Sequence, residues 1–243
     1  MRAESRFLSV VVLGLGLLPT AFAGVVWDNY PGNTYKPTTR FASELIPAGQ
    51  PVPRDALTID DFFLAQPTQI NSIEWIGMRD FAYEYPAAEY AFYQPQRDDG
   101  GQIIGFTQVF SQQAPYLAHS LAIVSDLDVY RASVNTPPVT LPAGEYFVGL
   151  RLVGGGPLAG GRNFAVVSQT GQGILGSTAY VRDPSLGPPF DQFAPTTSLP
   201  TTPIAADVAF RLTGVVVPEP ATLLGLLAGV AAFVRRGRTF SRA

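Results

Sequence analysis

The sequence predicts an all-β fold, a single antiparallel β-sandwich of jelly-roll-like form over residues 24–214, with an apolar segment at each end of the chain. Two observations support this fold class. Apolar side chains in the body of the chain alternate in twos, the spacing of a strand with one buried face, whereas helical periodicity is hard to find. Turn-forming residues separate the alternating segments at intervals of roughly 8–12 residues, as in sandwiches and jelly rolls.

The first apolar segment, residues 1–23, has the three parts of a secretory signal peptide. Basic residues precede an apolar stretch at Leu8–Leu18, which is too short for a stable membrane span. Ala21 and Ala23 form a small-x-small cleavage site before Gly24. We therefore expect export through the Sec translocon and removal of this segment by signal peptidase.

The predicted strands follow in the body of the chain. Every second residue of Glu145–Val153 is apolar, and Asp207–Thr213 alternates in the same way, with Phe210 on the apolar face and Arg211 on the other. Because successive side chains of a strand point to opposite faces, one face of each strand should be buried. Further strands are predicted at Ile70–Ile76, Tyr90–Tyr93, Ile103–Phe110, Leu127–Val134 and Asn163–Ser168.

Segments rich in proline and glycine mark the expected turns and loops. Asn29–Pro53 and Pro184–Pro203 show little apolar patterning and are expected to be irregular. Neither resembles an interdomain linker, so the body is expected to be one domain. Turns are predicted at Gln66-Pro67, Arg97–Gly101, Thr136–Pro138, Pro142–Gly144 and Gly154–Pro157.

The second apolar segment is the 14-residue run Ala221–Val234 near the C-terminus. As a helix it would be about 21 Å long, which is short for a hydrocarbon core of about 30 Å. A basic tail follows it, and positive charge of this kind remains cytoplasmic, so the body should lie across the membrane. The alternative is a buried core helix. The tail contains Arg235, Arg236, Arg238 and Arg242.

The end of the chain, residues 217–243, resembles the PEP-CTERM sorting domain of exported proteins in Gram-negative bacteria. The resemblance rests on Val217-Pro218-Glu219-Pro220, on the apolar helix at 221–234 and on the arginine tail, in that order. It implies recognition by an exosortase, a processing enzyme, after a transient stay in the inner membrane. The mature protein would then reach the cell surface or the extracellular matrix.

The body also resembles a group of PEP-CTERM proteins with a jelly-roll-like β-sandwich. The matching pieces are Asp60-Asp61-Phe62, Pro67–Trp75, the acidic turn Asp98–Gly101 and the hairpin Pro138–Tyr146. The resemblance covers about residues 55–213. It implies the fold only, because the group has no agreed activity.

The composition excludes several classes of partner. Ten of the 16 Lys and Arg residues and 17 of the 19 Asp and Glu residues lie in residues 24–217, which therefore carry a net charge of −7. An acidic body without a basic stripe is not expected to bind nucleic acid or anionic lipid. The chain has no cysteine, so the exported domain depends on its core rather than on disulfides.

His119 is the only histidine and lies in a stretch expected to be a loop. Without a Gly-x-Ser-x-Gly motif or a cysteine, nucleophilic catalysis has little support. Zinc is disfavoured for the same lack of ligands. We therefore expect a non-enzymatic protein without a zinc cofactor.

Paired carboxylates could hold calcium, which prefers oxygen ligands. Asp126 and Asp128 would share one face if they lay on a strand. Asp98 and Asp99 belong foremost to a hairpin turn. Asp60-Asp61 is a third pair. The alternative for all three pairs is solvated charge at turns and edges.

A carbohydrate contact is the remaining alternative. Glu74, Trp75 and Tyr90 belong to a group of carboxylates and aromatic residues of the kind that stack on sugars. Trp75 and the tyrosines could equally be core residues. The sequence thus favours a non-catalytic, exported β-sandwich sorted by its C-terminal signal. The alternative is a module that binds extracellular polysaccharide, with or without calcium.

Overall fold

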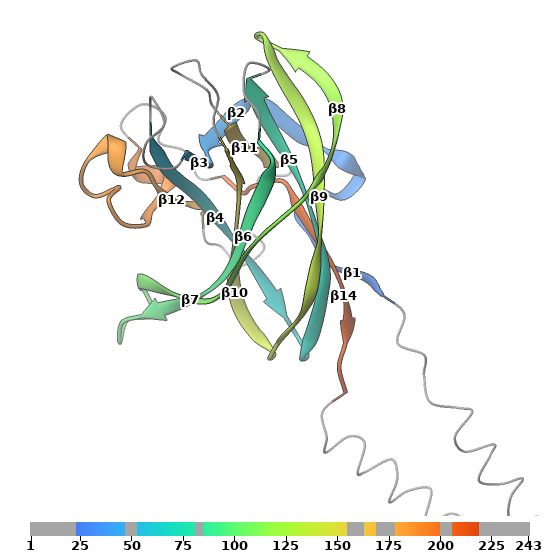
Figure 1. Cartoon of the computed structure of the whole chain (residues 1–243). Coiled ribbons are helices and arrows are strands. Elements are labelled where there is room, and N and C mark those ends of the chain that lie inside the picture. Colours follow the sequence, from blue (N-terminus) through green and yellow to red (C-terminus); the bar gives the residue numbers. More distant parts are fainter. Residues whose placement is uncertain are drawn as a thin grey trace, which may run out of the picture.

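The computed structural model describes residues 23–46, 53–80, 85–154, 163–168, 178–199 and 206–218. This part of the chain is all β, as the sequence predicts, and forms two seven-stranded sheets (Figure 1). Its only helical elements are three 3₁₀ segments of three residues each, η1 (Pro31–Asn33), η2 (Pro184–Leu186) and η3 (Thr196–Ser198). No helix among the described residues is long and apolar enough to cross a membrane.

The first sheet is built on β5 (Thr68–Asp80), whose whole length pairs with β9 (Leu127–Leu141). The other edge of β5 is divided between two strands: β14 takes its first half and β11 its second half. Three outer strands complete the sheet, with β8 beside β9, β1 beside β14 and β2 beside β11. These strands are β1 (Gly24–Asp28), β2 (Tyr35–Ala42), β8 (Leu117–Val124), β11 (Asn163–Ser168) and β14 (Phe210–Val216).

The second sheet has the order β13-β12-β4-β3-β10-β6-β7, and β4 also pairs with β10. Its strands are β3 (Glu44–Ile46), β4 (Arg54–Leu64), β6 (Ala87–Arg97), β7 (Ile103–Ala114), β10 (Gly144–Val153), β12 (Tyr180–Arg182) and β13 (Ala194–Pro195). β3 and β10 both run antiparallel to β4 along the same edge, so they are parallel to each other where they overlap. The expectation of a purely antiparallel fold is therefore wrong at this pair.

The main core lies between the two sheets. Alternate residues of β4, β6 and β10 face alternate residues of β5, β9 and β14 across it. Phe210 and Tyr146 are buried, as their position in the alternation predicts. Phe62 lies at the centre and contacts both, with ring centroids 6.4 and 5.7 Å away. Each aromatic side chain at such a site removes a large apolar area from water, which stabilises the contact between the sheets.

The outer face of the second sheet carries a further apolar cluster, which positions the site described below. It contains Leu57, Ile59, Ala91, Tyr93 and Phe147, and Phe106, Tyr180 and Phe193 pack against it. The strands β4, β6 and β10 are therefore buried on both faces, whereas simple alternation predicts one. The segment 178–195 and the first residues of β7 provide the covering side chains.

Four stretches that the sequence predicts as irregular or turning contain strands or lie within them. Asn29–Pro53 contains β2 and β3, Pro184–Pro203 contains β13, and Ala118-His119-Ser120 lies within β8. Thr136–Pro138 lies inside β9, at a bulge where the partners move from Asn135↔Ser72 to Val139↔Ile70. A bulge accommodates proline because its extra residues need not donate to the ladder. These strands depend on their partners rather than on local alternation.

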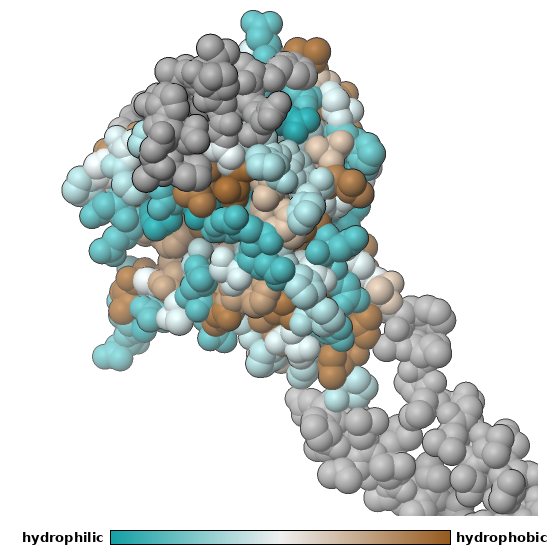
Figure 2. All heavy atoms as spheres, viewed as in Figure 1, coloured by the Kyte–Doolittle hydropathy of each residue, from teal (hydrophilic) through white to brown (hydrophobic). Residues whose placement is uncertain are grey.

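The surface is mixed in character. On the face shown in Figure 2, hydrophobic residues occur in small separate groups among hydrophilic ones. The predicted elements at the two ends of the chain fall largely outside the described residues. These are the signal peptide up to Phe22, Glu219 and Pro220 of the sorting motif, the helix 221–234 and the arginine tail. Val217 and Pro218 are described, and the Val217 N–H donates to the Pro67 carbonyl at 2.8 Å.

Candidate functional site

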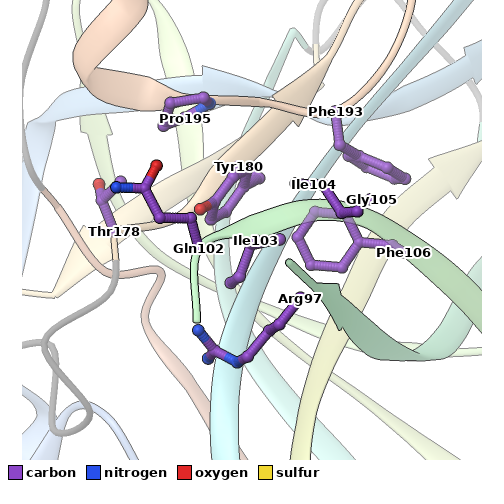
Figure 3. A pocket seen from close by; sticks show the side chains of 10 residues that line it. All are labelled: Arg97, Gln102, Ile103, Ile104, Gly105, Phe106, Thr178, Tyr180, Phe193 and Pro195. Carbon is purple, nitrogen blue, oxygen red and sulfur yellow. The ribbon is translucent and has the colours of Figure 1, made fainter. Parts of the chain in front are cut away.

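A pocket of about 440 Å³ opens on the outer face of the second sheet. Its walls come from two parts of the chain that are distant in sequence: the β6–β7 turn with the start of β7, and the segment around β12 and β13 (Figure 3). Its lining residues are Arg97, Gln102, Ile103, Ile104, Gly105, Phe106, Thr178, Tyr180, Phe193 and Pro195.

The β6–β7 turn holds one wall of the pocket in place. Asp98 Oδ1 accepts hydrogen bonds from the Gly100 and Gln102 N–H groups at 3.0 and 2.8 Å. Gly101 has a φ of 80°, a conformation that glycine adopts without steric cost. The predicted hairpin turn at Asp98–Gly101 is therefore confirmed. The turn places Gln102 in the lining of the pocket.

Arg97 is fixed beside this turn. Its guanidinium donates to both carboxylate oxygens of Glu145 at 2.6 and 2.7 Å and to the Gly101 carbonyl at 2.6 Å. The hydrogen bond to Glu145 is the first cause of the raised pKa of Arg97. The cation is thus engaged by this protein's own carboxylate, which makes it a poor site for an anionic ligand.

Three aromatic rings form the apolar end of the pocket. Phe106 packs edge-to-face against Tyr180 and Phe193, with centroid distances of 5.0 and 5.4 Å. Phe147 lies beneath Phe106 at 4.8 Å. Phe106, Tyr180 and Phe193 are each only partly buried, so the rings are rigidly packed and still reach solvent.

Polar groups gather at the other end. Figure 3 shows the Gln102 amide, the Thr178 hydroxyl and the Tyr180 hydroxyl on one side, and the rings of Phe106 and Phe193 on the other. Thr178 Oγ1 lies 2.7 Å from Thr196 Oγ1. Burial raises the pKa of Tyr180, so its hydroxyl is protonated at neutral pH and can donate. Within the described chain, no side-chain hydrogen bond occupies the Gln102 amide or the Tyr180 hydroxyl.

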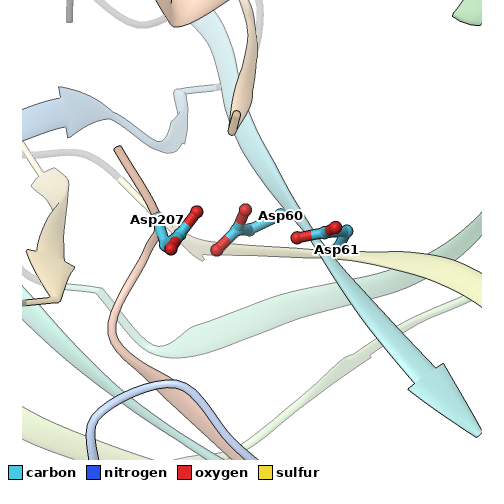
Figure 4. A group of neighbouring side chains, drawn as sticks. All are labelled: Asp60, Asp61 and Asp207. Carbon is cyan, nitrogen blue, oxygen red and sulfur yellow. The ribbon is translucent and has the colours of Figure 1, made fainter. Parts of the chain in front are cut away.

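A second cluster lies nearby, at the edge of β4. Asp60 and Asp61 of β4 and Asp207 of the segment before β14 each place one carboxylate oxygen within 4.8 Å of the others (Figure 4). They are 0, 1 and 4% exposed. β12 pairs with β4 only as far as Ile59, so this edge is open to Asp207 directly beyond that point.

The electrostatics of this cluster are unfavourable to negative charge. Burial raises the pKa of Asp60 well above its ordinary value, and the neighbouring Asp207 and Asp61 add to the effect. Burial and Asp61 raise the pKa of Asp207 to about 6. Asp60 Oδ2 accepts from the Val208 N–H at 2.7 Å and from the Asn29 amide at 2.9 Å.

The sugar-contact candidates lie elsewhere. Trp75 and Tyr90 are 1 and 0% exposed in the core between the sheets, so neither offers a ring face to a surface ligand. Glu74 is on the outer face of the first sheet, where it forms an ion pair with Arg211 at 3.3 Å and accepts a hydrogen bond from Tyr30. The structure does not bring these three residues together at one surface.

Two of the three carboxylate pairs that the sequence suggests for calcium do not belong to a metal-binding cluster among the described residues. Asp126 lies in the β8–β9 turn with a φ of 62°, so it does not share a strand face with Asp128. Asp128 is buried and forms an ion pair with Arg79 at 3.1 Å. Asp98 caps its turn, and Asp99 is exposed beside it. The one carboxylate cluster among the described residues that could hold a metal is Asp60, Asp61 and Asp207.

Sequence reasoning missed most of the residues that form both sites. Tyr180 lies on a strand of three residues, too short for a detectable alternation, and Phe193 lies in a segment expected to be a loop. Asp60-Asp61 was visible as a pair. Asp207 gave no signal, because its contact with β4 joins residues 147 positions apart and arises only from the fold.

Comparison with known proteins gives no family for this chain: no family model matches it, and no curated protein or solved structure matches it significantly.

Proposed function

We propose that this chain is an exported, non-catalytic protein whose jelly-roll-like β-sandwich binds a neutral saccharide segment of an extracellular polysaccharide. The observation that carries the binding part is the pocket formed by Phe106, Tyr180 and Phe193 together with the Gln102 amide. Sugars present apolar C–H faces and a rim of hydroxyls. A pocket with aromatic rings at one end and neutral polar groups at the other suits both.

The charge around the pocket favours a neutral rather than an acidic sugar. Arg97 is the only cation in the lining, and Glu145 neutralises it through two hydrogen bonds. The body as a whole is acidic, so it repels a polyanion at long range. These features support a neutral hexose segment as the ligand.

The lining of the pocket supports a binding function rather than catalysis. A glycosidase needs two carboxyl groups placed across the scissile bond. The residues that line the pocket, all of them described, include neither a carboxylate nor a histidine. His119, on β8, is not among them.

Export and sorting remain proposals based on the two ends of the chain. The signal peptide, the Val217–Pro220 motif, the apolar run and the arginine tail support an inner-membrane intermediate, processing by an exosortase and delivery to the cell surface or matrix. A polysaccharide-binding domain is consistent with that destination, because its ligand would be found there.

The test is binding of the full chain, purified in detergent, to an array of neutral and acidic polysaccharides. Phe193→Ala and Gln102→Ala should each weaken binding to the neutral members by about tenfold, as expected for the loss of one stacking or hydrogen-bonding group. Gln108→Ala is the matched control, since Gln108 is exposed on β7 outside the pocket. Equal binding by Gln102→Ala and Gln108→Ala would refute the assignment of the pocket.

A further inference from the structure

We propose that Asp60, Asp61 and Asp207 bind one divalent cation of the calcium type, which joins β4 to the segment that leads into β14. The proposal is independent of the saccharide pocket, because none of the three residues lines it. Of the three carboxylate pairs that the sequence suggests for calcium, only Asp60-Asp61 belongs to this cluster, and the fold adds Asp207 to it.

The spacing of the three carboxylates suits one cation. Calcium–oxygen distances of 2.3–2.6 Å allow two ligand oxygens of one ion to lie at most about 5 Å apart. The three carboxylate oxygens lie within 4.8 Å of one another, a spacing compatible with their binding to one ion. The three side chains converge from two segments in Figure 4.

The cluster differs from the other buried carboxylates of the described chain in its lack of arginine partners. Each of those forms an ion pair with arginine: Glu44 and Asp183 with Arg54 at 3.1 and 2.7 Å, and Asp128 with Arg79 at 3.1 Å. Asp60 and Asp207 have no such pair among the described residues. A buried charge needs a compensating charge or must be neutralised. Within the described residues, an arginine pairs with the carboxylate at each of the other three positions, and none pairs with Asp60 or Asp207.

One carboxylate oxygen of Asp60 lacks a hydrogen-bond donor among the described residues. Asp60 is fully buried, and its Oδ1 has no hydrogen-bond partner among the described residues, whereas Oδ2 has two. Asp128 Oδ1 also lacks a hydrogen-bond partner there, but the Asp128 carboxylate is paired with Arg79. The two bonds to Asp60 Oδ2 fix that carboxylate in place, so its Oδ1 is held rigidly where no donor of the described chain reaches it. Buried acceptors are rarely left in this state in proteins. A cation supplies what Oδ1 lacks.

The position of the cluster indicates what the cation would do. The segment before β14 lies along β11 of the first sheet, because the Ser168 N–H donates to the Asp207 carbonyl and the Ala209 N–H to the Val166 carbonyl. Asp60 on β4 of the second sheet accepts the Val208 N–H of this segment. A cation on Asp207 and Asp60 would add a second link between this segment and β4. Its role would be structural, as a cross-link in a domain that has no disulfides.

The test uses the full chain in detergent, first stripped with EDTA and then given calcium chloride. We expect one calcium ion per chain by metal analysis after gel filtration. The melting temperature should rise by about 5–10 °C at a calcium concentration 100 times the Kd. Terbium ion, which substitutes for calcium, should show luminescence sensitised by Trp27, whose indole N–H donates to Asn29, a partner of Asp60.

Asp207→Asn and Asp60→Asn should abolish the calcium response, whereas Asp99→Asn, the same change at an exposed turn carboxylate, should retain it. The rival explanation is a proton shared within the cluster. In that case calcium would leave the melting temperature of the stripped protein unchanged, and lowering the pH from 7 to 5 would raise it. That result, or a calcium response that survives in Asp207→Asn, would overturn the proposal. If the variants do not fold, the metal content and the EDTA response of the unaltered chain still decide between ion and proton.

Discussion

At the scale of the residue, one step along β14 changes the environment completely. Phe210 is fully buried between the sheets, whereas Arg211 lies on the outer face of the first sheet and pairs with Asp28 at 2.9 Å. The same guanidinium lies over the Tyr30 ring, 4.8 Å from its centroid. The outer face is therefore an organised surface of ion pairs and one aromatic ring, rather than a bare solvated face.

This contrast gives a prediction for single substitutions. Phe210→Ala should lower the free energy of unfolding by about 3–5 kcal/mol, because it leaves a cavity among buried aromatic rings. Arg211→Ala should lower it by only about 1–2 kcal/mol, the sum of partly exposed ion pairs and a cation–π contact. Urea denaturation of both variants measures the difference. Equal losses would mean that the register of β14 is wrong.

The alternation of apolar and polar residues along a strand predicts which side chains point inward. It does not predict whether an inward side chain belongs to the core or contacts a ligand. It places Tyr146 and Phe210 correctly in the core. It does not decide whether Trp75 and Tyr90 are core residues or contact a ligand, because a strand residue on an apolar face has the same pattern in both cases. Only the partner sheet decides, and here it covers both rings.

At the scale of the element, the β6–β7 turn is predicted from sequence because its geometry is local. Asp98 accepts two backbone N–H groups within four residues of itself, and the glycine at 101 takes the left-handed conformation. Each requirement is carried by a residue type that prefers it, so the turn needs no distant partner to form.

Asp98→Ala should therefore loosen this turn. We expect a loss of about 1–2 kcal/mol in the free energy of unfolding, from two hydrogen bonds near the surface. If the pocket binds saccharide, the affinity should also fall, because Gln102 is held by one of these bonds. Asp99→Ala, at the neighbouring exposed position, should change neither quantity by more than about 0.5 kcal/mol. Chemical denaturation and array binding of the two variants provide the comparison.

The elements that were missed fail the same criterion. β2 contains Lys36 and Pro37, and β13 has only two residues, so neither shows a period of two. Both are outer strands of their sheets, where proline is tolerated and where the neighbouring strand supplies the pairing. β8 was not predicted from the sequence because its small and polar residues give no alternating apolar pattern. β2, β13 and β8 form because β11, β12 and β9 have unpaired edges to which they can hydrogen-bond. A short stretch of sequence does not show that such an edge is present.

At the scale of the whole molecule, the all-β class and the core were predictable, and the two sites were not. The pocket joins Gln102 to Tyr180, and the acidic cluster joins Asp60 to Asp207. Contacts of this range follow from the order of strands in the sheets, which alternation does not specify. The sequence could therefore indicate aromatic and acidic residues in general but could not select those that converge.

The sorting proposal makes a prediction about the complete chain. Replacing Pro218, Glu219 and Pro220 by Ala should leave export intact and block C-terminal processing. The product should stay in the membrane fraction and be heavier than the processed form by about 2–3 kDa, the mass of a tail of some 23 residues. Intact-mass measurement of both proteins from a host with an exosortase decides the matter. Retention of Arg235–Ala243 by the unaltered protein would make the tail a simple anchor.

The pairing of β1 with β14 has a consequence for the time course of folding. β1 is made near the start of the chain and β14 near its end, and Asp28 and Arg211 are 183 residues apart. β1 has no other strand partner among the described residues. Contacts of such separation form slowly, because a long loop must close first. The first strand must therefore wait, unpaired, until nearly the whole domain has been synthesised. A chain truncated before Phe210 would leave β1 with nothing to pair with and half of one β5 edge exposed.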